Sequence, residues 1–217
     1  MTKLLALETS TVACSAALWI NGQITQKFEI APQKHAEILL NLVDALLNDI
    51  RTNLKDLDAV AFGSGPGSFI GVRIATGVAQ GIAYAMSLPV IPVSTLQALA
   101  QTAYRKTNNE KVISGWDARM NSIYWGAYRA NAEKTMQTIV RDRVDCPKNI
   151  RFPKGKWLCV GNAWSIYSSF LLIDDCQFIK TDVYPDAASV ASIAYQKFKI
   201  GDVLPPEKAE PTYIREK

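Results

Sequence analysis

The same pattern of strand, acidic residue, polar turn and strand occurs twice in this chain. It begins once at Lys3, in KLLALETSTVACSAALW, and again at Lys111, in KVISGWDARMNSIYWGAY. Glu8 and Asp117 occupy matching places at the end of the first strand of each copy. The two copies agree in pattern more than in residue identity, and a repeat of this length predicts two lobes built on one plan.

The residues after each copy predict the remaining elements. Asn21-Gly22 is a strong signal for a tight hairpin and predicts a third antiparallel strand over 23–30, and residues 135–144 can supply the equivalent strand in the second copy. Hydrophobic periodicity and bounded apolar runs predict the rest: helices over 35–50, 68–86, 94–105 and 186–201, and strands over 58–62, 89–93 and 156–160.

Two lobes that each open with three antiparallel strands and continue with helix and strand units resemble the superfamily of actin, hexokinase and the heat-shock chaperone ATPases. We therefore expect an α/β fold with two ribonuclease H-like lobes, each a mixed sheet flanked by helices. The predicted lobes span residues 1–105 and 106–217. The second lobe is less complete, and the C-terminal tail is expected to pack back on the first.

A glycine-rich stretch, GSGPGSFIGVR, runs from Gly63 to Arg73. Such loops often hold phosphates, but a P-loop needs a lysine after its last glycine, and a dinucleotide fingerprint needs a third glycine where this chain has Ser68. Neither motif is complete. Gly65, Gly67 and Ser68 are therefore weak candidates for nucleotide binding, and the alternative is that the glycines only permit a tight turn.

Small residues fill two rows of the helix predicted after this loop, for which Ser68 can act as the N-cap. A glycine costs a helix about 1 kcal/mol relative to alanine, so close packing of another backbone is the expected compensation. The rows follow a spacing of four residues: Gly71, Ala75, Ala79 and Ala83 form one, and Gly77, Gly81 and Ala85 form the other.

The chain has a single histidine, His35. A zinc peptidase presents two histidines one helical turn apart, and no serine lies in the nucleophile-elbow motif of the hydrolases. A peptidase is therefore disfavoured. His35 opens an amphipathic helix, and we expect it at the surface or in an interface.

Charge, cysteine content and hydropathy indicate an ordinary intracellular protein. The formal net charge is +4, below what dedicated nucleic-acid binders show. Asp142 and Asp145 dilute the most basic run, residues 141–156, which is typical of a solvated face, with an RNA contact as the alternative. None of the four cysteines forms a C-x-x-C pair, which favours a reduced, cytosolic protein. The charge-free run between Arg73 and Arg105 is interpreted as a buried helix and strand rather than a membrane span.

Five segments in order along the chain resemble the bacterial TsaB family: LALETST, GPGSFIGVR, VSTLQALA, DARMNSIYW and EPTYIR. They cover nearly the whole chain, and the second is the most specific. It departs from the family pattern at one position, where Ile70 replaces a threonine. The role of a hydroxyl at that position is thereby in doubt, while the fold assignment is not.

The resemblance implies a partner subunit that has no catalytic residue of its own. TsaB proteins bind TsaD, a paralogue that carries the metal and the active site, and work with TsaE, an ATPase, to place threonylcarbamoyl on the adenosine beside the anticodon of certain tRNAs. By this resemblance, ATP or ADP and metal belong to the partner subunits, tRNA is met through the complex, and the protein is cytoplasmic. Alone it is expected to be a homodimer that uses much the same helical surface.

The predicted partner surface combines the helices over 35–50 and 68–86. Arg73 is unfavourable in the first turn of its helix because of the helix dipole, which favours a contact with a partner. The predicted interface residues are His35, Ile38, Leu39, Leu42, Arg73, Ile74, Gly77, Val78 and Gly81. The alternative from another class is an ATP-dependent small-molecule kinase, in which Glu8 and Asp117 would hold magnesium beside the glycine loop.

Overall fold

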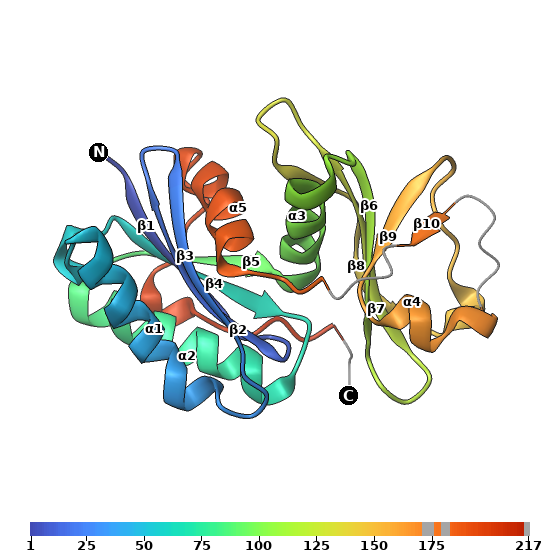
Figure 1. Ribbon diagram of the computed structural model, residues 1–217, viewed down its shortest axis with the longest axis horizontal. Helices are drawn as coiled ribbons and strands as arrows, with labels where there is room; N and C mark the ends of the chain where they lie inside the picture. The colour runs from blue at the N-terminus through green and yellow to red at the C-terminus, as the bar shows by residue number, and fades with distance from the viewer. Residues whose placement is uncertain (171–175, 179–182, 215–217) are drawn as a thin grey trace.

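Two five-stranded sheets lie side by side in the computed structural model, with helices packed between them (Figure 1). The structure describes residues 1–170, 176–178 and 183–214. The first sheet contains β1 (Lys3–Glu8), β2 (Ala13–Ile20), β3 (Gln23–Ile30), β4 (Ala59–Gly65) and β5 (Val90–Ser94). The second contains β6 (Lys111–Asp117), β7 (Ile123–Ala130), β8 (Met136–Asp145), β9 (Trp157–Val160) and β10 (Cys176–Phe178).

Both sheets have the same topology. The strand order is β3-β2-β1-β4-β5 in the first and β10-β9-β6-β7-β8 in the second. In each sheet the first three strands of the copy pair antiparallel and the last two run parallel to the first. The predicted fold class is therefore confirmed, and the sequence repeat corresponds to a structural one.

The described α-helices are α1 (His35–Ile50), α2 (Phe69–Met86), α3 (Thr95–Thr107), α4 (Ala163–Ile166) and α5 (Ala187–Lys199). The first sheet is covered by α1 and α2 on one face and by α5 on the other, whereas α4 packs on β6. Side chains alternate along a strand, so Leu5 and Leu7 of β1 face the core under α1 and α2, whereas Leu4 and Ala6 face α5. The helix α3 lies between the sheets and packs on β6, β7 and β8.

Three predicted helix starts are capped by a side-chain oxygen. Ser68 accepts from Gly71 N at 3.3 Å in α2, and Asp186 accepts from Ser189 N at 2.7 Å in α5. Ser94 accepts from Gln97 N at 3.1 Å in α3. The reciprocal hydrogen bond from Ser94 N to the Gln97 side chain is absent, and the Gln97 Nε2 donates to the Met136 carbonyl of β8 at 2.7 Å.

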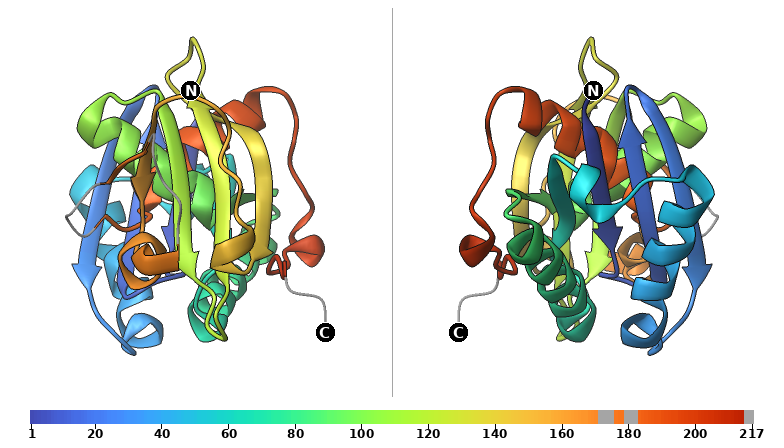
Figure 2. Two further views of the ribbon diagram at one scale, coloured as in Figure 1. Left: turned by 90° about the vertical axis from the view of Figure 1, so that its right-hand side faces the viewer. Right: turned by 90° about the vertical axis from the view of Figure 1, so that its left-hand side faces the viewer.

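The residues after the second sheet return to the first one (Figure 2). The amides of Ala187 and Ala188 donate to side chains of β2 and β3, and Leu204 pairs with Val90 of β5. Farther on, Thr212 N donates to Ser64 O at 2.7 Å. The division of the chain at residue 105 stays a prediction.

Candidate functional site

The glycine loop between β4 and α2 packs against the turn between β1 and β2. Ser68 N donates to Ser10 O at 2.7 Å, and Gly65 N donates to Thr95 Oγ1 at 3.2 Å. A Cβ at Gly67 would stand 2.5 Å from the same Ser10 carbonyl. These amides are thus used by the fold of the chain itself, and the glycines allow two backbone segments to approach closely.

Gly71 extends this close approach into the first turn of α2. A Cβ at Gly71 would overlap the Thr9 carbonyl oxygen, and the Thr9 hydroxyl donates to Gly71 O at 2.6 Å. The helix begins where its backbone touches the β1–β2 turn. The close packing expected for the small residues is therefore present at this end of their first row.

Glu8 lies beneath the same turn and has no exposed surface. Its Oε1 accepts from Ser10 N at 2.6 Å, whereas its Oε2 has no hydrogen-bond partner among the residues that the structure describes. A Cβ at Gly63 would overlap that oxygen, so any larger residue there would require the Glu8 side chain to shift. Burial, opposed by the hydrogen bonds to Ser10 and aided by the nearby Asp186 carboxylate, raises the pKa of Glu8 to about 7.

Asp117 makes the equivalent contact in the second sheet. Its Oδ1 accepts from Arg119 N at 2.9 Å, two residues along, just as Glu8 accepts from Ser10. Asp117 also accepts from the Tyr167 hydroxyl at 2.9 Å and pairs with the Arg119 guanidinium at 3.2 Å. The two carboxylates therefore brace the two matching turns. Among the described residues no group of three or more His, Cys, Asp and Glu side chains is arranged to hold a metal ion.

The two rows of small residues on α2 face in different directions. Ala75, Ala79 and Ala83 are completely buried against the first sheet. Gly77 and Gly81 are exposed, and a Cβ built at either would meet nothing within 4 Å. The second row therefore has no compensating contact in the part of the chain that the structure describes.

The predicted interface residues divide into three groups by exposure. Arg73, Gly77 and Gly81 are exposed, and Ile38, Ile74 and Val78 are half-buried. Leu39, Leu42 and His35 are buried in this chain.

The surface position expected for His35 is wrong. The spacing of His35, Leu39 and Leu42 puts the histidine on the core-facing stripe of α1. There it is 7% exposed, and its Nε2 has no hydrogen-bond partner within the described part of the chain.

Large apolar side chains are exposed on α1 and α2, and two of them, Leu40 and Tyr84, were not singled out from the sequence. Leu40 of α1 is 54% exposed, and Ile70 and Tyr84 of α2 are 70% and 68% exposed. Ile70 and Tyr84 each lie seven residues from Gly77, about two helical turns away, so the spacing in the sequence already puts them on the same face of α2 as the exposed glycines. With Gly77 and Gly81 they give this exposed face of α2 a large share of apolar and small residues. By length and composition α2 could also cross a membrane, but its other face packs on β4 and β1.

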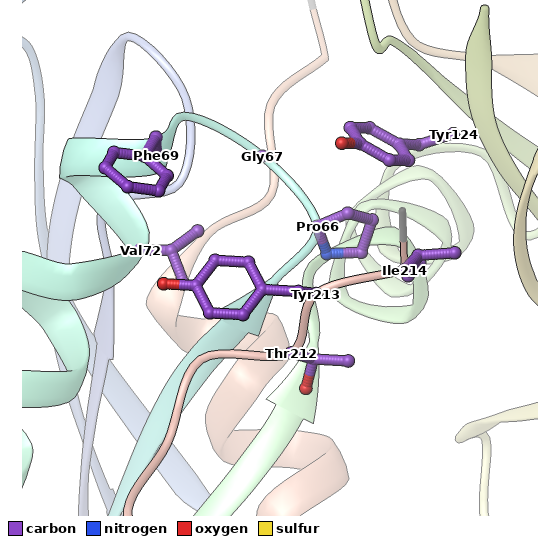
Figure 3. Close-up of a pocket in the computed structure, with 8 residues that line it drawn as sticks. All are labelled: Pro66, Gly67, Phe69, Val72, Tyr124, Thr212, Tyr213 and Ile214. Atoms are coloured by element: carbon purple, nitrogen blue, oxygen red, sulfur yellow. The ribbon is translucent and has the colours of Figure 1, made fainter. Parts of the chain in front are cut away.

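A small pocket lies at the start of this surface, between the glycine loop and the C-terminal segment (Figure 3). The Arg73 guanidinium stacks 3.4 Å from the centre of the Phe69 ring and lies 5.7 Å from that of Tyr213. The unfavourable position of Arg73 is thus offset within the chain by aromatic rings. The pocket is lined by Pro66, Gly67, Phe69, Val72, Tyr124, Thr212, Tyr213 and Ile214.

Comparison with known proteins agrees with this architecture. A family model described as TsaD: tRNA N6-adenosine threonylcarbamoyltransferase matches residues 24–207. The tRNA threonylcarbamoyladenosine biosynthesis protein TsaB of Escherichia coli (strain K12) is 37% identical over 98% of this chain and 94% of that protein. The TsaB protein of Haemophilus influenzae is 35% identical over 98% of this chain and 93% of its own length.

A solved structure, YeaZ from Pseudomonas aeruginosa, superimposes with a TM-score of 0.93 at 38% identity and covers 98% of this chain and 100% of its own. The fold and the family model define the class first: a two-lobed α/β protein related to the tRNA N6-adenosine threonylcarbamoyltransferases. Within that class the chain belongs to the TsaB family.

Proposed function

We propose that this protein is the non-catalytic partner subunit of a complex that forms N6-threonylcarbamoyladenosine in tRNA. It would bind and activate a TsaD-type catalytic subunit. The relatives named for this biosynthesis match almost the whole chain, and the transferase family model spans most of it. The observation that carries the proposal is the exposed row of small residues on α2.

The composition of that row supports a docking surface. Two glycines in an exposed helix interior cost about 1 kcal/mol each relative to alanine, and no contact with the described residues offsets this at Gly77 and Gly81. A partner helix laid along the row could approach closely, because neither glycine presents a side chain. Leu40, Ile70 and Tyr84 would supply the apolar area that a stable interface needs.

The geometry of the glycine loop supports a subunit without its own active site. Its amides at Gly65 and Ser68 donate to Thr95 and Ser10, so they are not directed at a ligand. The Glu8 carboxylate lies against Gly63, and the residue has no exposed surface. The kinase alternative needs both groups to be open to ATP and magnesium. ATP, ADP and metal are proposed to bind the partner subunits.

The proposal extends to the other members of the assembly. A TsaE-type ATPase would complete the complex in the cytoplasm, and tRNA would be met through the assembly. In the absence of the catalytic subunit, two copies of this chain would pair through the same α1 and α2 surface as a homodimer. The same surface would then form either the homodimer or the complex with the TsaD-type subunit, but not both at once.

Size-exclusion chromatography with light scattering tests this, with the protein alone and mixed with a purified TsaD-type subunit from the same source. We expect a dimer that converts to a one-to-one complex. A monomer that forms no complex with the catalytic subunit would overturn the proposal. Calorimetric titration with ATP and magnesium would then test the kinase alternative, which requires tight binding by the isolated chain.

A further inference from the structure

A basic segment crosses the outer face of the second sheet. Residues 146–156, called the strap below, lead from β8 to β9 on the side that points away from α3 (Figure 2, left). Apolar anchors fix it to the sheet: Pro147 and Ile150 are buried, and the Phe152 ring packs edge-on against Trp125 and Trp164, with centroid separations of 5.9 and 5.4 Å. Its outward side chains therefore start from a fixed backbone.

Four of the outward side chains of the strap are cations. Lys148, Arg151, Lys154 and Lys156 are all exposed, and among the described residues none has a carboxylate within 4.0 Å. Arg151 donates from Nη1 to the carbonyls of Lys148 and Ile150, which orients the guanidinium without neutralising it.

The two acidic residues of this region are turned away from the surface. Asp142 accepts hydrogen bonds from the Ser94 and Tyr128 hydroxyls. Asp145 accepts from Trp125 Nε1 at 2.8 Å and pairs with Arg143 at 2.5 Å. The carboxylates that dilute the basic run in the sequence therefore do not neutralise the strap.

The whole net charge of the protein resides in this region. Residues 141–156 contain six of the 24 lysines and arginines and two of the 20 aspartates and glutamates, which leaves 18 of each elsewhere. An excess of four positive charges thus lies within 16 consecutive residues, in a chain that is otherwise balanced. Such a concentration is the electrostatic footprint of a polyanion partner.

We propose that the strap, together with the exposed Arg141, binds the phosphate backbone of RNA. This inference rests on the proposed function, from which the RNA would be the tRNA that the complex modifies. Lysines and arginines without internal partners keep their full charge available to phosphates, and binding releases the counterions condensed on the nucleic acid. An exposed ring beside the cluster, Phe170 under the Lys148 ammonium at 5.7 Å, can additionally stack on an unpaired base.

The test replaces Lys148, Arg151, Lys154 and Lys156 with Gln in the full chain. The control removes the same charge from four exposed lysines elsewhere: Lys55, Lys106, Lys199 and Lys208. Both variants are titrated with an unmodified tRNA transcript at several salt concentrations, alone and in complex with the TsaD-type subunit. Binding to that subunit is measured separately.

The strap variant is expected to lose about tenfold or more in tRNA affinity near 0.1 M salt. The magnitude of the slope of log affinity against log salt should fall by roughly one for each phosphate contact removed. The control variant should keep most of its tRNA affinity and most of its salt dependence. Equal losses in the two variants, or unchanged affinity in the strap variant, would overturn the proposal and leave the proposed function intact.

Two other outcomes are also decisive. A strap variant that keeps its tRNA affinity but no longer binds the catalytic subunit would assign the strap to an acidic protein surface and overturn the proposal. If the wild-type chain does not bind the TsaD-type subunit at all, the proposed function fails, and the titration of the chain alone still decides whether the strap binds RNA.

Discussion

The two rows of small residues on α2 have the same spacing and similar composition but different surroundings. The row from Gly71 to Ala83 is buried on the first sheet, where the Gly71 backbone touches the Thr9 carbonyl. The row through Gly77 and Gly81 faces open space. One sequence signal thus has two causes: the first row is required by the fold of this chain, and the second is left for a contact outside it.

The largest effect is expected at the buried row. Gly71→Ala would place a methyl group on the Thr9 carbonyl oxygen, a backbone atom that cannot move aside as a side-chain tip can. We expect a loss of about 3 kcal/mol in the free energy of unfolding, the upper end of what overpacking costs. Urea denaturation measures it. Gly77→Ala on the exposed row is the matched control, and equal effects in the two variants would break the comparison.

Glu8→Gln tests the turn on which the buried row rests. Because the folded state raises the pKa of Glu8 from 4.5 to about 7, the wild type retains the full stability of this site below pH 4.5 and loses it as the pH rises through 7. The variant has no such loss. The free energy of unfolding of the variant should exceed that of the wild type by about 3 kcal/mol at pH 8. This difference should disappear near pH 4.5.

Denaturation of both proteins across that pH range measures the difference. Glu37→Gln, on the exposed side of α1, is the control that removes a carboxylate without touching the turn. A constant difference between Glu8→Gln and the wild type would show that burial does not control the ionisation of Glu8.

The exposed row should respond to alanine with the opposite sign. Gly77→Ala with Gly81→Ala places two methyl groups in open space on a helix, so the free energy of unfolding of the isolated chain should rise by about 1–2 kcal/mol. The melting temperature of monomeric protein at low concentration reports this gain. Gly22→Ala also adds a methyl group in open space, but at a φ of +89°, and should destabilise. A loss in the double variant would mean that the row is already packed within the chain.

Ile70→Thr is expected to have the smallest effect. It restores the residue of the family pattern at a side chain that is 70% exposed. Exposed substitutions usually change stability by less than about 0.5 kcal/mol, and thermal unfolding should show no more than this. A larger change would reveal a contact of the hydroxyl at the start of α2.

The sequence predicts local structure better than long-range contacts. The repeat predicts both sheets, and the hydrogen-bonding side chains of Ser68, Ser94 and Asp186 predict three helix starts, because these signals lie within a few residues of their effect. Periodicity also identifies both rows of α2, but their identical spacing does not say which row meets the sheet. That depends on the Thr9 contact, 62 residues away.

The position of His35 and the direction of Asp142 differ in how far the sequence indicates them. His35 lies on the core-facing stripe of α1, which its spacing from Leu39 already indicated. Asp142 turns inward because Ser94, 48 residues earlier, and Tyr128 offer hydroxyls. No local pattern contains that information, so the sequence alone does not show that the Asp142 carboxylate is directed away from the exposed cations of the run.

The most direct test of the account is the affinity of the Gly77→Ala, Gly81→Ala double variant for the TsaD-type subunit, measured by isothermal titration calorimetry beside the wild type. The account predicts a chain that is more stable and yet binds at least about tenfold more weakly, a loss of about 1.4 kcal/mol, because two methyl groups hold the partner backbone away. Unchanged affinity in the stabilised variant would contradict it, since the exposed row would then not be the surface that the partner contacts.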